Sequence, residues 1–289
     1  MAAGSPSFLA LPLVHDPSLR TLLTSSTTCS SISLYRAHPL PFSLSYTRST
    51  AGAIDASSSA GGVFLDNIGL HRLQTLEKYI REDELDGGGW LEIRHMEDSE
   101  VDPTVMLLSD SYAETMGVPQ RYVPLLSFFV KQYLVERRSL VPHAAMLVGF
   151  YRDSGVKEPE LACTAEVSFD SRGANAAPPT PLPPSDFPYI CNMAVKKALR
   201  RKGIARRLLK ACEELISLMK TNKKVYLHCR VIDKGPLMLY KKSDYRIDKT
   251  DSILVWLTLQ RRKHLLVKEL PLEEDAPPDG HTAAVVVNC

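Results

Sequence analysis

The chain has 289 residues and a nearly balanced charge, with 35 Lys and Arg against 33 Asp and Glu. Its Ser-rich start and Pro-rich end leave room for about one core of ordinary size. The small net charge gives no global sign of a nucleic-acid or acidic partner, and no apolar run approaches the roughly 18 residues that span a bilayer.

Residues 1–55 have the composition of an organellar transit peptide. Ser, Thr, Leu and Ala dominate, three arginines are present, and Asp16 is the only acid before Asp55. Such a stretch cannot bury a core and must be unfolded during import, so we expect disorder. Its hydroxyl-rich run at residues 25–33 favours the chloroplast stroma over the mitochondrion. An ordinary disordered tail is the alternative.

The six cysteines are scattered along the chain without the CxxC or Cys/His spacing of zinc sites. Several of them lie in apolar runs, where a free cysteine behaves as a small hydrophobe. We therefore expect a reducing compartment, no structural disulfide and no metal.

The first half of the chain alternates between helical and strand-like patterns. Residues 65–87 form a helical lead-in, because Leu73, Leu76 and Ile80 recur at helical spacing before three glycines at 87–89. The elements expected next are a strand at 90–94, helices at 105–116 and 122–136, and a hairpin of strands at 145–151 and 161–169.

The second half begins with a Pro- and Ala-rich loop at 173–188. We expect the following elements after it: a central strand at 189–195, an amphipathic helix at 202–220, a strand at 225–231, a short helix at 235–242, and closing strands at 245–246 and 252–258. The domain is therefore assigned to residues 88–270, followed by a polar tail at 271–289.

A strand, a basic loop and a helix form the most informative unit, from "YICNMAV" to "KKALRRKGIARRLL". Gly203 and Ala205 let the backbone approach a ligand closely, and the N–H groups and dipole of a helix start favour an anion. Arg201, Lys202 and Arg206 add positive charge. The unit therefore predicts a diphosphate cradle, although GxxxxGK[ST] and a strand-adjacent GxGxxG are both absent.

The sequence resembles the GNAT superfamily of N-acetyltransferases at this point. Residues 200–205, "RRKGIA", match the family's pyrophosphate loop [Q/R]-x-x-G-x-[G/A], and "MAV" at 193–195 stands where the family has an apolar-Ala-Val triplet. Downstream, Leu239-Tyr240 and Tyr245 match the family's L-Y and G-F positions. The close resemblance covers about residues 189–246.

The resemblance implies an α/β fold with a central mixed, mostly antiparallel, twisted sheet that is flanked by helices and splayed at an acetyl-CoA site. Acetyl-CoA would be the co-substrate, and no metal is implied. The residues expected to bind it are Met193, Ala194, Val195, Arg201, Lys202, Gly203, Ile204, Ala205, Arg206 and Asp233.

Three positions depart from the family pattern. Asp233 replaces the usual Asn with an acceptor-only carboxylate, so a coenzyme contact there is lost or altered. Pro236 replaces a small helical residue and is tolerable in a first turn. Asp244 replaces the turn glycine, at a cost if the backbone there is left-handed.

The resemblance also implies direct transfer to an amine, with a backbone N–H near Val195 stabilising the oxyanion and Tyr240 protonating the thiolate. His228 falls where ribosomal-protein N-terminal acetyltransferases have a catalytic Glu. An imidazole titrates close to neutral pH, so we take His228 as the base. Glu166, on the preceding hairpin, is the rival.

Four functions remain open on the sequence. The favoured one is acetylation of protein or peptide amines, either N-terminal α-amines or lysine ε-amines, in plastids. A small-amine acetyltransferase, acting on an arylalkylamine or a polyamine, and a noncatalytic acyl-CoA sensor are the alternatives. A nucleic-acid binder is disfavoured because no stacking aromatics interleave with the basic residues. The oligomeric state stays open.

Overall fold

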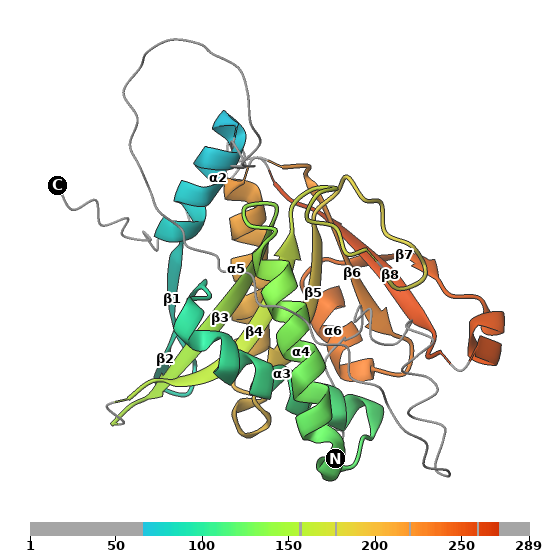
Figure 1. Cartoon of the computed structure of the whole chain (residues 1–289), viewed down its shortest axis with the longest axis horizontal. Coiled ribbons are helices and arrows are strands. Elements are labelled where there is room, and N and C mark those ends of the chain that lie inside the picture. The colour runs from blue at the N-terminus through green and yellow to red at the C-terminus, as the bar shows by residue number, and fades with distance from the viewer. Residues whose placement is uncertain (1–65, 156–157, 177, 220, 259, 272–289) are drawn as a thin grey trace, which may run out of the picture.

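The structure is a computed structural model, and it describes residues 66–271 except 156–157, 177, 220 and 259 (Figure 1). The transit peptide expected at 1–55 and nearly all of the expected polar tail lie outside the described residues. Both therefore stay predictions.

One sheet of eight strands runs through the described part of the chain, in the order β1-β2-β3-β4-β5-β6-β8-β7. Every neighbouring pair is antiparallel except β5 and β6, so the predicted mixed, mostly antiparallel sheet is confirmed. The strands are β1 (Ile80–Glu84), β2 (Gly89–His95), β3 (Ala144–Asp153), β4 (Glu160–Ser168), β5 (Tyr189–Val195), β6 (Lys224–Arg230), β7 (Arg246–Thr250) and β8 (Lys263–Glu269).

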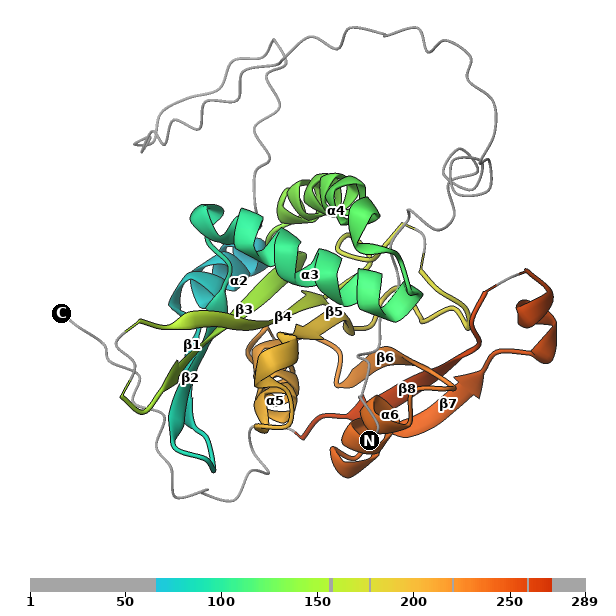
Figure 2. The same ribbon diagram turned by 90° about the horizontal axis from the view of Figure 1, so that it is seen from below.

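Helices cover both faces of this sheet (Figure 2). On one face lie α3 (Val101–Met116) and α4 (Val123–Arg138), which share an apolar cluster with Met146, Val148 and Ala194 of the strands. On the other face lies α5 (Ile204–Leu218). The remaining helices are α2 (Asn67–Lys78) and α6 (Lys234–Lys242), with short 3-10 turns at Asp98–Glu100, Gln120–Tyr122, Lys197–Leu199 and Ile253–Thr258.

The two elements that carry the sequence motif form as expected. All seven side chains of β5 are buried, as is usual for a central strand, and six of the seven residues are largely apolar while Asn192 is polar. In α5 the stripe that includes Leu208, Cys212 and Leu215 is buried, while Arg206 and Lys210 are exposed on the other side. The motif is therefore held between the middle of the sheet and one packed helix.

Two expectations about the ends of the domain are wrong. The helix expected within residues 65–87 ends at Lys78, and the polar segment Ile80–Glu84 pairs with β2 as an edge strand. Its one buried residue, Asp83, is accommodated by ion pairs with Arg81 and Arg207 rather than by apolar packing. At the other end, the expected strand at 252–258 is largely the 3-10 turn Ile253–Thr258, and β8 was not anticipated.

The sheet opens between β5 and β6. Parallel pairing is confined to Tyr189 with Tyr226 and Ile190 with Leu227, after which β5 continues without β6 as a neighbour. The predicted splay is therefore confirmed, and the second half of β5 has one edge free of strand pairing.

Candidate functional site

The end of β5 directs one backbone N–H into the opening. Lys196 donates its N–H to Ala162 O (2.7 Å), so Lys196 and Ala194 point their backbone groups at β4 and Val195 points its groups the other way. The Val195 carbonyl accepts from Arg200 Nε (3.1 Å). The Val195 N–H is thus directed toward the side where the sheet is splayed, as the oxyanion role predicted for it requires.

The loop after β5 is shaped by left-handed backbone. Arg201 (φ 71°) and Gly203 (φ 85°) both occupy this region, and α5 begins directly after Gly203 without a side-chain cap. A helix start that lacks a cap leaves its first N–H groups for another acceptor, and its dipole favours an anion. Ile204 is 1% exposed, so its part in such a site is limited to its backbone.

The basic side chains of the loop fall into two groups. Arg201 and Arg206 are exposed, and neither makes an ion pair within the described residues. Lys202 instead bonds to Tyr151 Oη (3.0 Å) and lies 3.6 Å from Asp153. The uncapped helix and these two free guanidiniums fit a coenzyme diphosphate.

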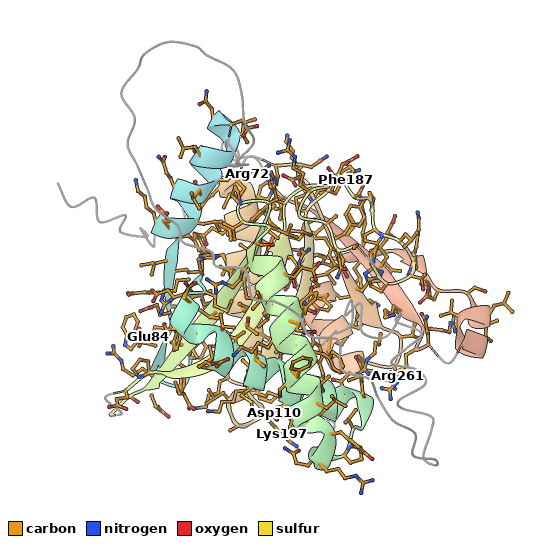
Figure 3. The ribbon with its side chains drawn as sticks, viewed as in Figure 1. Arg72, Glu84, Asp110, Phe187, Lys197 and Arg261 are labelled. Atoms are coloured by element: carbon orange, nitrogen blue, oxygen red, sulfur yellow. The ribbon has the colours of Figure 1, made fainter. Side chains whose placement is uncertain are left out.

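Arg200, which sequence reasoning did not single out, ties the loop to the helical layer. Its guanidinium binds both carboxylate oxygens of Glu114 on α3 (3.0 and 2.8 Å) while its Nε holds the Val195 carbonyl. The hydrogen bonds from Arg200 lower the pKa of Glu114. Figure 3 labels Phe187 and Lys197, the residues that flank β5, at opposite ends of this strand, near the top and the bottom of the view.

Asp233 is engaged inside the protein. Both of its carboxylate oxygens accept from Arg230, at 2.6 and 2.9 Å, and both side chains are buried. Burial raises the pKa of Asp233, and the guanidinium opposes that rise. The predicted contact of this side chain with the coenzyme therefore competes with an internal ion pair.

His228 on β6 uses both ring nitrogens. Nε2 lies 2.8 Å from the Pro181 carbonyl, which only accepts, so Nε2 carries the proton. Nδ1 then accepts from the Tyr189 hydroxyl at 2.9 Å. Burial lowers the pKa of His228 to about 4. The titration near neutrality that was expected for this residue is therefore absent, and the imidazole is neutral at pH 7.

Glu166, the rival base, is fully occupied. One carboxylate oxygen accepts from Tyr133 Oη (2.6 Å) and Asn192 Nδ2 (2.7 Å), and the other accepts from Arg137 Nε (2.5 Å). The residue is 1% exposed. Within the described residues its carboxylate is therefore committed to partners inside the protein, and its hydrogen bonds to Tyr133, Arg137 and Asn192 include no contact at the opening in the sheet.

Tyr240, the predicted acid, lies on α6 with its ring packed edge-to-face on Tyr245 (centroids 5.9 Å apart). It is 3% exposed, and its hydroxyl lies 3.9 Å from Met193 Sδ on β5. Burial raises the pKa of Tyr189, and the neighbours that add to the rise include Tyr240. Tyr240 thus lies against Met193, in the half of β5 that has no β6 neighbour.

Tyr189 was not identified from the sequence as a functional residue. It is the first residue of the strand motif and resembles its apolar neighbours, and its link to His228 depends on the parallel register of β5 and β6.

In the part of the chain that the structure describes, no helix is long and apolar enough to cross a membrane. Within that same part, no three His, Cys, Asp or Glu side chains gather as a metal site would require.

Comparisons with solved structures give the following similarities. A GNAT-family acetyltransferase from Streptococcus pneumoniae is 15% identical and aligns over 63% of this chain and 99% of its own, with a TM-score of 0.43. RimL, described as a ribosomal L7/L12 alpha-N-protein acetyltransferase in complex with coenzyme A, is 11% identical over 66% of this chain and 98% of its own, with a TM-score of 0.47.

Sequence comparison is more informative. Residues 147–245 match the acetyltransferase (GNAT) family. GCN5-related N-acetyltransferase 5, chloroplastic, from Arabidopsis thaliana is 51% identical over 217 residues, which cover 72% of this chain and 67% of the relative. The chloroplast named for this relative confirms the predicted location. On this identity and coverage, the chain belongs to the GNAT family of acetyltransferases.

Proposed function

We propose that this protein transfers the acetyl group of acetyl-CoA to amines of proteins or peptides in plastids, at N-terminal α-amines, at lysine ε-amines, or at both. The observation that carries the proposal is the opening between β5 and β6, where an unpaired strand edge and the uncapped start of α5 occur together. The chloroplast N-acetyltransferase relative supports the reaction. RimL, by its description, acts on protein α-amines.

We assign the following roles to the residues that would hold the coenzyme. Backbone groups of Met193 and Val195 would bind its pantetheine arm, and the N–H groups at the start of α5, with Arg201 and Arg206, would bind its diphosphate. Bound acetyl-CoA supplies a thioester, whose carbonyl is open to attack by an amine. The Val195 N–H would stabilise negative charge on the acetyl oxygen, and the Tyr240 hydroxyl would protonate the departing sulfur.

The amine proton would leave through Tyr189. His228 cannot be reached directly, because its Nδ1 is occupied by Tyr189 and its Nε2–H by the Pro181 carbonyl. As the amine attacks, its nitrogen becomes strongly acidic and gives a proton to Tyr189 Oη. Tyr189 passes its own proton to His228 Nδ1. A neutral imidazole of low pKa suffices here, because the donor has become more acidic than a free ammonium.

One observation favours a noncatalytic acyl-CoA sensor as the second candidate. Asp233 stands where the family commonly has Asn, and its carboxylate is committed to Arg230. A protein that lost one coenzyme contact in this way could bind the coenzyme without efficient turnover. The sensor reading predicts coenzyme binding with no acetylated product.

The test is an acetylation assay on the full chain with acetyl-CoA and three acceptors: a peptide with a free α-amine and no lysine, an N-blocked peptide with one lysine, and a polyamine. Mass spectrometry reads the product, and calorimetry reads coenzyme binding. The proposal predicts acetylation of at least one peptide and little of the polyamine. Coenzyme binding without any product supports the sensor, and product on the polyamine alone supports a small-amine enzyme.

A further inference from the structure

The backbone groups of β5 reverse their directions partway along the strand. At its start, Tyr226 donates its N–H to Pro188 O (2.9 Å), so the even-numbered residues point their backbone groups toward β6. At its end, Lys196 donates to Ala162 O, so the even-numbered residues point toward β4. A regular strand cannot do both. Somewhere between these points the alternation must slip by one residue.

The slip occurs at Asn192. The register between β4 and β5 shifts between Cys191, opposite Glu166, and Ala194, opposite Thr164. Within this interval Asn192 adopts a left-handed backbone with φ 50°. Without the slip, the alternation seen at the start of the strand would turn the Val195 N–H toward β4. The bulge is thus the reason that this N–H faces the opening.

Asn192 is held in this conformation by a buried polar network. Its Oδ1 accepts from Tyr112 Oη on α3 (2.9 Å), and its Nδ2 donates to Tyr133 Oη on α4 (2.9 Å) and Glu166 Oε2 on β4 (2.7 Å). The side chain is 0% exposed. Because Glu166 only accepts and is the shared partner, the orientation of the amide is fixed.

Arg137 anchors the network. Its Nε binds Glu166 Oε1, and its other nitrogens donate to the carbonyls of Gly173 and Ala174 in the loop after β4. Arg137 is 7% exposed and Glu166 is 1% exposed, so the ion pair is buried. Removing either Arg137 or Glu166 would leave the other charge buried without its partner. The ion pair therefore keeps the Glu166 carboxylate, and with it the amide of Asn192, in one arrangement.

We propose that Asn192 is a positioning residue: through Tyr112, Tyr133 and Glu166 it fixes the slip in β5 that turns the Val195 N–H group into the opening. This inference rests on the proposed function, because that group matters as a ligand of the coenzyme. Glu166 then acts through Asn192 and not as a base. Asn adopts a left-handed backbone more readily than most residues do. In this protein the hydrogen bonds of the network favour that conformation of Asn192 over the extended backbone of a regular strand.

The test compares coenzyme binding in full-chain variants by calorimetry with CoA. Asn192→Gly tolerates a positive φ but lacks the amide, and Tyr133→Phe removes one partner while leaving Asn192 in place. Val130→Ala is the control, since Val130 is a 0% exposed core residue of α4 outside the network. We expect roughly tenfold or greater weakening of CoA binding in Asn192→Gly, a smaller weakening in Tyr133→Phe, and none in Val130→Ala at a comparable loss of melting temperature.

Unchanged CoA affinity in both Asn192→Gly and Tyr133→Phe would overturn the proposal and leave the network a purely structural one. If Asn192→Gly does not fold, Tyr133→Phe decides alone. Binding is measured without turnover, so a wild type that binds CoA but acetylates nothing defeats the proposed function and leaves this test intact. A wild type that does not bind CoA defeats both. In steady state, kcat should fall in Asn192→Gly while KM for the amine stays within about twofold.

Discussion

Tyr189 Oη donates a 2.9 Å hydrogen bond to His228 Nδ1 across the junction where β5 and β6 part. The bond fixes the tautomer of His228 together with the Pro181 carbonyl, and it occupies the Nδ1 lone pair of the imidazole. The base predicted from the sequence is therefore half of a pair. Its partner lies on a strand that is 39 residues distant in the chain.

Folding stability should depend on pH through His228. Burial lowers its pKa from 6.5 to about 4, so below pH 6.5 the unfolded chain takes up a proton that the folded chain refuses. The contribution of neutral His228 to the free energy of unfolding is therefore fully present above pH 6.5, and up to about 3 kcal/mol of it is lost as the pH falls to 4. Urea unfolding of wild type and His228→Gln should show that the difference between their free energies of unfolding narrows over this range. A difference that is constant from pH 7 to 4 would contradict it.

Coenzyme affinity should depend on the backbone of the loop. In Gly203→Val a side chain is forced onto a position with φ 85°, where no protein atom lies within 4 Å of the added Cβ, so the loss comes from backbone strain and from blocked access to the coenzyme. We expect CoA binding to weaken tenfold or more, about 1.4 kcal/mol.

Gly117→Val is the matched control for this loop variant, because Gly117 has φ 70° and equally open surroundings at the end of α3. It should lose stability and keep its CoA affinity by calorimetry. Equal losses of affinity in the two variants would remove the loop from the coenzyme site.

Tyr240→Phe should separate an enzyme from a coenzyme-binding protein. The change keeps the ring packing on Tyr245 and removes the hydroxyl, so CoA affinity should barely move. Turnover should fall by roughly 100-fold or less, because a thiolate is already a fair leaving group. Tyr245→Phe, the neighbouring aromatic, should retain most activity. Full turnover in Tyr240→Phe would take this residue out of the mechanism.

The chloroplast-targeting signal should lie within residues 1–60. A fusion of residues 1–60 with a fluorescent protein is expected to enter chloroplasts, because the stretch is rich in hydroxyls and poor in acids. Microscopy of leaf cells, with an established plastid protein as control, reads the outcome. A fusion that stays in the cytosol while the control is imported would place the signal elsewhere.

Local patterns predicted the parts of the fold that depend on local sequence. The largely apolar composition of Tyr189–Val195 predicts a buried strand, and the helical periodicity of apolar residues predicts the amphipathic helix α5. The edge strand β1 does not, because its buried Asp83 is compensated by Arg81 on the same strand and by Arg207, which lies far along the chain. Such an ion pair carries no periodic signal.

The same distinction, between features set by local sequence and features that form only on folding, applies to the candidate site. The loop around Gly203 could be found from a motif, since its chemistry lies within one short segment. The low pKa of His228 and the slip at Asn192 could not, because both depend on side chains from several elements that meet only after folding. Sequence reasoning therefore located the coenzyme loop and left open how the amine is deprotonated.

The most direct measurement of the proposed proton path is a double-mutant cycle. Acetyl transfer to a peptide amine is measured for wild type, Tyr189→Phe, His228→Gln and the double variant, with Tyr226→Phe as a control hydroxyl on the same cluster of side chains. If Tyr189 passes the proton to His228, each single variant lowers kcat by a similar factor, the double variant lowers it no further, and Tyr226→Phe retains activity. Losses that multiply in the double variant, or a fully active Tyr189→Phe, would contradict the path.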